Sequence, residues 1–329
     1  MGHGRPDDRI VILTQTRPRD YAVPVLLGAG ATGIGLLVPV AGPLLIALLA
    51  GAVVANLVEI PSGWSATTKT ALRLGVVLLG LKLPVNQVLD IGWQGIATVL
   101  ITIAATYGGT LLVGRRLRTD DDITRLIAVG FSICGAAAIA AVEDAVHARR
   151  EAVALAVAMV TLWGSLMIAV VPALSSWFGL SDRAAGVWVG ASVHEVAQVV
   201  ATASVVGGGA VAVATTIKLM RVVMLAPMHV VVARGSAQHE HQATPGIPWF
   251  VTAFVLAIAV RSTGVLGSGA LDVANAASLF LLAMGMVGLG FGVRLATLWP
   301  LPWRVVALAA CSTVIALTVS GALVVLLLA

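Results

Sequence analysis

Charged residues are scarce in this sequence. Asp, Glu, Lys and Arg make up only 11% of its 329 residues, whereas the hydrophobic types make up 59%. Soluble domains carry roughly a quarter charged residues and about half apolar ones, so this composition excludes an ordinary soluble protein. A helix that crosses a lipid bilayer needs roughly 20 mostly apolar residues. The composition therefore predicts a protein whose main partner is the bilayer.

Other absences exclude further classes of protein. Only two cysteines occur, Cys134 and Cys311, both among apolar residues, which argues against a disulfide framework. The sequence has no phosphate-binding loop and no dinucleotide fingerprint, so neither an ATP-driven pump made of this chain alone nor a nucleotide cofactor is expected. The net charge of +5 is spread over short segments between apolar runs. That pattern indicates membrane orientation and not a nucleic-acid partner.

The apolar runs predict an all-α polytopic membrane protein with about ten or eleven transmembrane helices. We assign residues 1–20 to a cytoplasmic N-terminal tail, because this polar stretch has no apolar core of signal-peptide length. Residues 21–329 form a single transmembrane domain. This orientation follows the positive-inside rule, with Arg149 and Arg150 as the main exceptions. The expected spans are 21–38, 43–60, 68–83, 93–114, 123–147, 151–173, 184–206, 210–233, 247–261, 275–293 and 302–328.

A weak internal repeat is visible at a constant offset of 210 residues, between residues 74–93 and 284–303. The matching spans lie an odd number of helices apart, so segments of about 43–114 and 248–328 would be inverted repeats. Many secondary transporters are built from such repeats. The alternative is a chance similarity between two glycine-rich helices. The aligned pairs are Gly75 with Gly285, Gly80 with Gly290, and Trp93 with Trp303.

Small polar residues interrupt the apolar run 128–144, and we expect a helix break there. Gly130 is a candidate break residue because glycine tolerates non-helical backbone. A helix that restarts after Gly135 would turn its positive N-terminal end toward a cavity, where it attracts an anion. Ser132 and Cys134 lie in the same interruption. The alternative is that the small residues only allow neighbouring helices to pack closely.

A second interrupted run, 186–209, holds most of the ionisable chemistry. His194 and Glu195 form a plausible proton-binding pair, since histidine titrates near neutral pH. On one continuous helix, His194 and Gln198 would share a face. A zinc peptidase is excluded because Gln198 stands where a second histidine would be needed, and we expect no metal, cofactor or enzymatic activity. A purely structural polar cluster remains the alternative. Gly190 and Ser192 complete the motif, with Gly190 as its expected break glycine.

Lys218 and Arg221 lie three residues apart near the middle of an apolar span. Two cations at membrane depth need compensation, and Glu195 is the only obvious acid at a similar depth. The surplus positive charge favours an anionic substrate. A bridge from Lys218 or Arg221 to Glu195 that merely joins helices is the alternative. Glu143 and Asp144 fall at a span end, where we expect them to be solvated.

Four motifs, LRLGVVLLGLKL, GFSICGAAAIAAV, GASVHEVAQVVA and IKLMRVVMLAP, closely resemble those of the YeiH-like family of sulfate exporters. The resemblance covers about residues 40–325. It implies an inverted-repeat secondary transporter of the bacterial cytoplasmic (inner) membrane, with crossed broken helices, and related folds suggest a homodimer. Relatives often read SICGASA, and Ala137 replaces that serine here, so substrate contact would differ at this position.

These observations together predict a secondary transporter that exports a small anion, such as sulfate or a sulfonate, by alternating access. His194 and Glu195 would couple transport to protons. Two alternatives stay open: a cation/proton antiporter, for which acids should outnumber bases at mid-membrane, and a non-transporting scaffold or sensor. The expected substrate-binding residues are Ser132, Cys134, Gly135, Ser192, Gln198, Lys218 and Arg221.

Overall fold

The computed structural model describes residues 19–37, 42–237, 249–291 and 302–328, which are helical with no strand among them. Five helical stretches in these ranges are long and apolar enough to cross a membrane, which confirms the all-α membrane fold class. The predicted tail, residues 1–20, lies outside the described residues except for Arg19 and Asp20, which begin the first described helix. The five stretches are α5 (Val85–Leu117), α8 (Arg150–Trp177), the consecutive helices α11 (Gly208–Val223) and α12 (Leu225–Ala237), α14 (Ser268–Gly290) and α16 (Trp303–Leu328).

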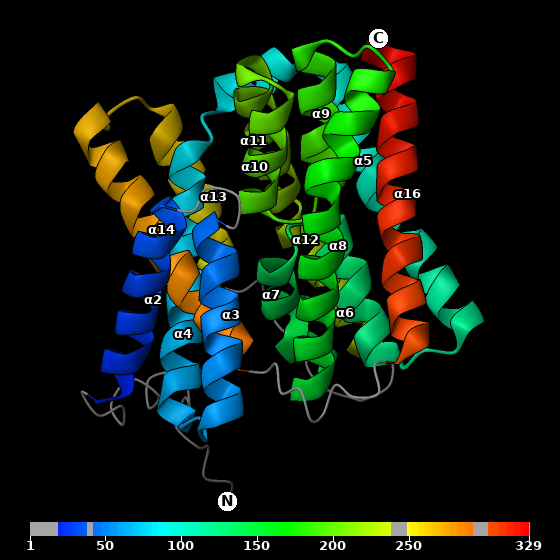
Figure 1. The fold of residues 1–329 in the computed structure, drawn as a ribbon. Helices are drawn as coiled ribbons and strands as arrows, with labels where there is room; N and C mark the ends of the chain where they lie inside the picture. The colour runs from blue at the N-terminus through cyan, green and yellow to red at the C-terminus, as the bar shows by residue number, and fades with distance from the viewer. Residues whose placement is uncertain (1–18, 38–41, 238–248, 292–301, 329) are drawn as a thin grey trace, which may run out of the picture.

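The helices form two groups, each packed mainly within itself (Figure 1). We call the first group the panel. It contains α2 (Arg19–Leu37), α3 (Gly42–Leu57), α4 (Ser62–Leu79), the short helix η2 (Gly80–Lys82), α13 (Trp249–Ser262) and α14. We call the second group the hairpin module. It contains α5, α6 (Asp121–Ser132), α7 (Ala136–Val146), α8, α9 (Asp182–Ser192), α10 (Val196–Val206), α11, α12 and α16.

The predicted span 123–147 is interrupted as expected, but it does not cross the membrane. Helix α6 ends at Ser132, and α7 begins after Gly135, whose φ of 74° lets the backbone reverse sharply. Arg149, just beyond α7, pairs with Asp120, just before α6, at 2.9 Å. Both ends of the segment therefore lie at the same end of the molecule, and α6–α7 is a re-entrant hairpin, named hairpin 1 here.

The predicted span 184–206 is a second re-entrant hairpin, hairpin 2, formed by α9 and α10. Its two ends meet where the backbone N–H of Gly209 donates to Asp182 Oδ2 at 3.2 Å. Figure 1 shows α9 and α10 in the upper half of the molecule and α6 and α7 in the lower half, so the hairpins enter from opposite ends. The resemblance implied that the two interrupted segments are crossed, broken helices that span the membrane. That expectation is wrong, because both segments double back. A doubled-back segment of this length carries the same hydropathy as a spanning helix.

Neither glycine proposed as a break residue lies at a break. Gly130 is inside α6 and Gly190 is inside α9. A Cβ at Gly130 would lie 2.8 Å from the side chain of Ile139 on α7, and one at Gly190 would lie 2.5 Å from the carbonyl oxygen of Ala214 on α11. These glycines allow close helix packing, which is the alternative that the sequence left open for small residues.

Helices α4 and α14 pack against each other at the centre of the panel through reciprocal contacts. A Cβ at Gly75 would lie 2.9 Å from Leu282, and a Cβ at Gly285 would lie 2.5 Å from Leu72. The two contacts correspond to each other at the 210-residue offset, with Gly75 matching Gly285 and Leu72 matching Leu282. Two copies of one motif that pack about a two-fold axis make contacts of this kind.

Candidate functional site

The tips of the two hairpins meet at α11, where two fully buried cations join them. Lys218 Nζ donates to the carbonyl oxygens of Ile133 at 2.6 Å and Val193 at 3.0 Å. Arg221, one turn further along, reaches both tips as well. Its guanidinium donates to the carbonyl oxygens of Phe131 (2.8 Å), Ser132 (3.1 Å), Gly190 (3.2 Å), Ala191 (2.7 Å) and Val193 (3.1 Å).

The two cations compensate the C-terminal ends of α6 and α9. The last carbonyl groups of a helix have no partner within it and carry the negative end of its dipole. Lys218 and Arg221 satisfy such groups at both hairpin tips. No ion pair joins either cation to Glu195 within the part of the chain that the structure describes, so the bridge considered from the sequence is not formed. The positive charge of Lys218 and Arg221 is therefore largely compensated by backbone carbonyl groups.

Glu195 lies at the opposite helix ends, the N-termini of α10 and α7. It is the N-cap of α10 and forms a capping box with Gln198, whose Oε1 accepts from the Glu195 N–H at 3.1 Å. A Cβ at Gly135 would lie 2.6 Å from Glu195 Cγ, so the acid also contacts the residue that caps α7. Glu195 is 6% exposed, and its Oε1 has no hydrogen-bond partner. An acid is thus placed where the positive ends of two helix dipoles converge.

His194 does not share a helix face with Gln198, because it precedes α10 in the non-helical tip. Its Nε2 lies 3.1 Å from Thr313 Oγ1 on α16, and its ring packs 4.4 Å from that of Phe131. His194 and Glu195 are adjacent in sequence but face different surroundings. The structure therefore does not bring the two side chains of the predicted proton-binding pair together at one cavity.

The serines and Gln198 are engaged within the protein. The hydroxyl of Ser132 donates to Val129 O at 3.2 Å, and that of Ser192 donates to Trp188 O at 2.7 Å. Gln198 Nε2 donates to Thr161 O on α8 at 3.2 Å. These three side chains bond to backbone carbonyls and do not line the space beside Glu195.

A small cavity of about 40 Å³ lies between the hairpin tips and the panel. Glu195 and Cys134 line it, together with the first residues of the restarted helices, Ala136 and Ala137 of α7 and Val196 of α10. Of the predicted site residues, only Cys134 and Glu195 line this cavity. The panel closes the opposite side with Leu44, Leu72, Val76, Leu79, Leu282 and Met286.

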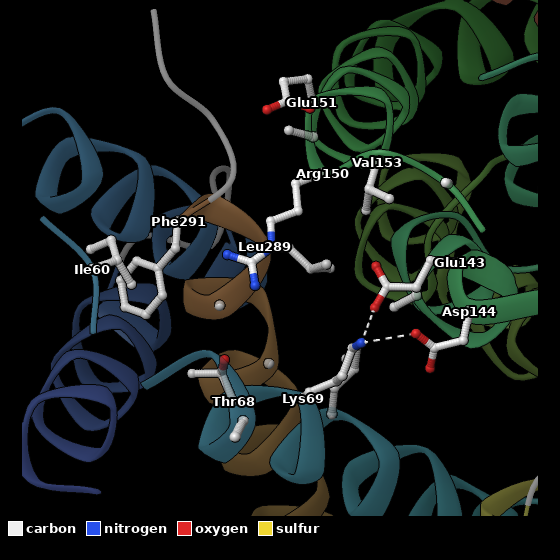
Figure 2. A pocket seen from close by; sticks show the side chains of 17 residues that line it. Ile60, Thr68, Lys69, Glu143, Asp144, Arg150, Glu151, Val153, Leu289 and Phe291 are labelled. Atoms are coloured by element: carbon white, nitrogen blue, oxygen red, sulfur yellow. Dashed lines mark hydrogen bonds and ion pairs between the residues drawn. The ribbon is translucent and has the colours of Figure 1, made fainter. Parts of the chain in front are cut away.

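A larger cavity of about 790 Å³, the vestibule, lies between α4 and α14 of the panel and α7 and α8 of the hairpin module. Figure 2 shows Lys69 reaching from α4 to Glu143 and Asp144 at the end of α7. Arg73, one turn further on α4, pairs with Asp144 at 3.2 Å. Leu72 lines both this cavity and the small one. The vestibule thus adjoins the site, and ion pairs between the two groups border it.

The sequence pattern did not predict these ion pairs. Glu143 and Asp144 were expected to be solvated; the side chain of Asp144 is indeed 68% exposed, but both acids also pair with the panel. One signal was present, since Lys69 and Arg73 are four residues apart and so share a helix face. A sequence contains no information on which acids such a face will meet.

Comparison with known proteins places this chain beside membrane proteins of several bacteria. A family model described as "Conserved hypothetical protein 698" matches residues 23–309. The UPF0324 membrane protein Cgl0015/cg0018 of Corynebacterium glutamicum is 38% identical over 78% of this chain and 77% of its own length. The UPF0324 inner membrane protein YeiH of Escherichia coli is 32% identical over 84% of this chain and 80% of its own length. No solved structure matches this chain.

Proposed function

Because the chain belongs to the UPF0324 family of membrane proteins, which includes YeiH, we propose that it is a secondary active transporter of a small anion such as sulfate or a sulfonate. One observation carries this proposal: the N-termini of α7 and α10 converge on a small cavity beside Glu195. Helix N-termini that face a cavity at membrane depth hold anionic substrates in several transporter folds. Transport, and not catalysis, is the activity that we propose.

In this proposal, the positive potential of the anion site comes from helix N-termini and not from the two buried cations. Lys218 and Arg221 donate to carbonyl groups at the hairpin tips, so they act on a substrate only through the geometry of those tips. The first N–H groups of α7 and α10 have no partner within their own helices. They supply both hydrogen-bond donors and a positive potential to an anion in the cavity.

Alternating access would occur at the boundary between panel and hairpin module. Both cavities lie on this boundary, and movement of the hairpin module along the panel would carry the tips from one side of the membrane to the other. We take segments 43–114 and 248–328 to be the inverted repeats that give the panel its two-fold contacts between α4 and α14. The vestibule is the open access route in this conformation.

We propose that hairpin 1 enters from the cytoplasmic side, which places the start of α2 on that side as well. With hairpin 1 doubled back, Arg149 pairs with Asp120 and Asp122, so Arg149 and the adjacent Arg150 no longer oppose the positive-inside rule. Arg183 moves to the other side, where it donates to the carbonyl of Asp90. The proposed location is the bacterial cytoplasmic membrane, with export as the direction that the resemblance implies.

A cation/proton antiporter is the second candidate, favoured by one observation: the Oε1 of Glu195 is buried and unpartnered, as the proton- or cation-binding acid of an antiporter would be. Against it, a cation bound there would face the positive ends of two helices. Sodium and sulfate fluxes measured on the same preparation separate the two candidates. A scaffold or sensor would carry neither ion.

The test is exchange of radiolabelled sulfate and methanesulfonate in proteoliposomes that contain the purified protein. We expect exchange by the wild type and at least a tenfold loss in Ala137→Leu, because the larger side chain fills the cavity at the start of α7. Ala104→Leu on the exposed face of α5 is the matched control and should keep wild-type exchange. The proposal fails if the wild type exchanges neither anion, or if Ala137→Leu exchanges as fast as the control.

A further inference from the structure

Glu195 occupies the place that a substrate anion would take. Its carboxyl lies at the N-terminus of α10 and against Gly135 at the N-terminus of α7. It lines the small cavity, is more than nine-tenths buried, and has an unpartnered Oε1. An ionised Glu195 therefore acts as a resident anion that neutralises the same two helix ends on which the proposed substrate depends.

Few other charged or titratable groups face Glu195. Hairpin 1 contributes the thiol of Cys134, and α11 contributes Lys218, whose ammonium group bonds to the carbonyls of Ile133 and Val193. Arg221 donates to the carbonyl of Val193 as well, and His194 is bonded to Thr313 instead. Within the described residues, the panel side chains that line the cavity are apolar. Glu195 is therefore the group whose ionisation decides the net charge of this space.

A cavity of about 40 Å³ has no room to separate two negative charges. An anion beside an ionised Glu195 would meet strong repulsion at low local dielectric. Protonation of Glu195 removes this repulsion, frees both helix N-termini, and converts the carboxyl into an O–H donor toward the anion. The anion and the proton then favour each other's binding.

We infer that the substrate anion and one proton bind together at the hairpin tips, with Glu195 as the proton site. This inference rests on the proposed function and adds the coupling. When the anion leaves, Glu195 loses its proton and again caps the two helices, which lets the empty hairpin module return. Anion and proton move in the same direction, so an inward proton gradient drives anion uptake. Export then requires an outward anion gradient that exceeds the opposing proton gradient.

The experiment uses proteoliposomes loaded with a pH-sensitive dye and supplied with radiolabelled sulfate. For the wild type, we expect an external medium one pH unit more acidic than the lumen to increase initial sulfate uptake at least fivefold, and sulfate entry to acidify the lumen. Glu195→Gln is permanently neutral and has the same shape. It should still exchange sulfate at equal pH, at a rate that differs from wild type, but this exchange should show no response to the gradient. Glu59→Gln, a change at an exposed acid outside both cavities, should behave as wild type.

The outcomes separate the inference from the proposed function. Wild-type sulfate entry without proton movement overturns the inference and leaves anion transport standing, and this measurement needs no variant. A Glu195→Gln protein that elutes and melts like wild type overturns it too, if it keeps the full response to the gradient or exchanges no sulfate. Absence of both sulfate and methanesulfonate exchange in the wild type overturns the proposed function together with the coupling.

Discussion

The ammonium nitrogen of Lys218 lies 2.6 Å from the carbonyl oxygen of Ile133 at the tip of hairpin 1. The same nitrogen reaches Val193 at the tip of hairpin 2, so one buried cation ties together two segments that enter from opposite ends. A cation at the C-terminal end of a helix is favourable because it meets the negative end of the dipole. Lys218 meets two such ends at once, and this contact fixes the relative position of the tips.

Lys218→Met should destabilise the fold. The change leaves the carbonyl of Ile133 buried without the ammonium donor and leaves that of Val193 with Arg221 alone, and an unsatisfied buried group costs about 1–3 kcal/mol. We expect a lower melting temperature in detergent, measured by scanning fluorimetry together with size-exclusion chromatography. Lys82→Met, at a partly exposed position outside the hairpin tips, is the matched control. A melting temperature equal to that of the control would contradict the bridging role of Lys218.

Gly190→Ala should also destabilise the protein, by about 1–3 kcal/mol. The added Cβ would lie 2.5 Å from the backbone carbonyl of Ala214, which cannot move without shifting α11. Gly33→Ala on α2 adds the same methyl group where nothing lies within 4 Å, and it should be neutral or stabilising. Melting temperatures of the two variants, compared with wild type, give the difference. Equal effects would mean that α9 and α11 do not pack as closely as described.

The re-entrant topology predicts which positions share a side of the membrane. Single cysteines at Asp120 and Arg149, placed in a background that lacks both native cysteines (Cys134→Ala and Cys311→Ser), should react with an impermeant maleimide from the same side, because these residues are ion-paired. Cysteines at Ser181 and Gly208, at the two ends of hairpin 2, should both react from the opposite side. Intact cells and inside-out vesicles provide the two measurements. Labelling of positions 120 and 149 from different sides would mean that residues 123–147 cross the membrane and would contradict the re-entrant hairpin.

The ion pairs at the vestibule should stabilise the present conformation. Glu143→Gln removes the carboxylate that pairs with Lys69 across the boundary between panel and hairpin module. The pair is partly exposed, so we expect an effect of about 1 kcal/mol, or roughly fivefold in the conformational equilibrium. Maleimide labelling of Cys134, which lines the small cavity beside the vestibule, should slow by a similar factor in a Cys311→Ser background, which retains Cys134. Asp272→Asn, an exposed change on α14, is the control. Unchanged labelling of Cys134 would mean that this pair does not hold the vestibule open.

Much of the candidate site followed from residue types alone. An ionisable residue in an apolar span must find a partner, and this rule singles out Glu195, Lys218 and Arg221 by their positions along the chain. Their partners were not predictable. The sequence offered Glu195 as the counter-charge of the cations, whereas the partners are carbonyl groups at the two hairpin tips. Backbone groups are present at every residue, so a sequence does not mark which of them lose their helical partners.

Hydropathy and residue types are enough to predict that this chain is an all-α membrane protein, that two of its apolar segments are interrupted, and which few polar groups lie at the depth of these segments. The turning back of the interrupted segments is visible only in the folded molecule, since hydropathy is the same for a helix that crosses and for two half-helices that return. The structure also decided that Glu195 faces the cavity while His194 does not. The direction in which each side chain points depends on the backbone conformation at Gly135 and at Val193–Glu195. At these positions the local sequence allows several conformations, and the packing of distant helices selects one of them.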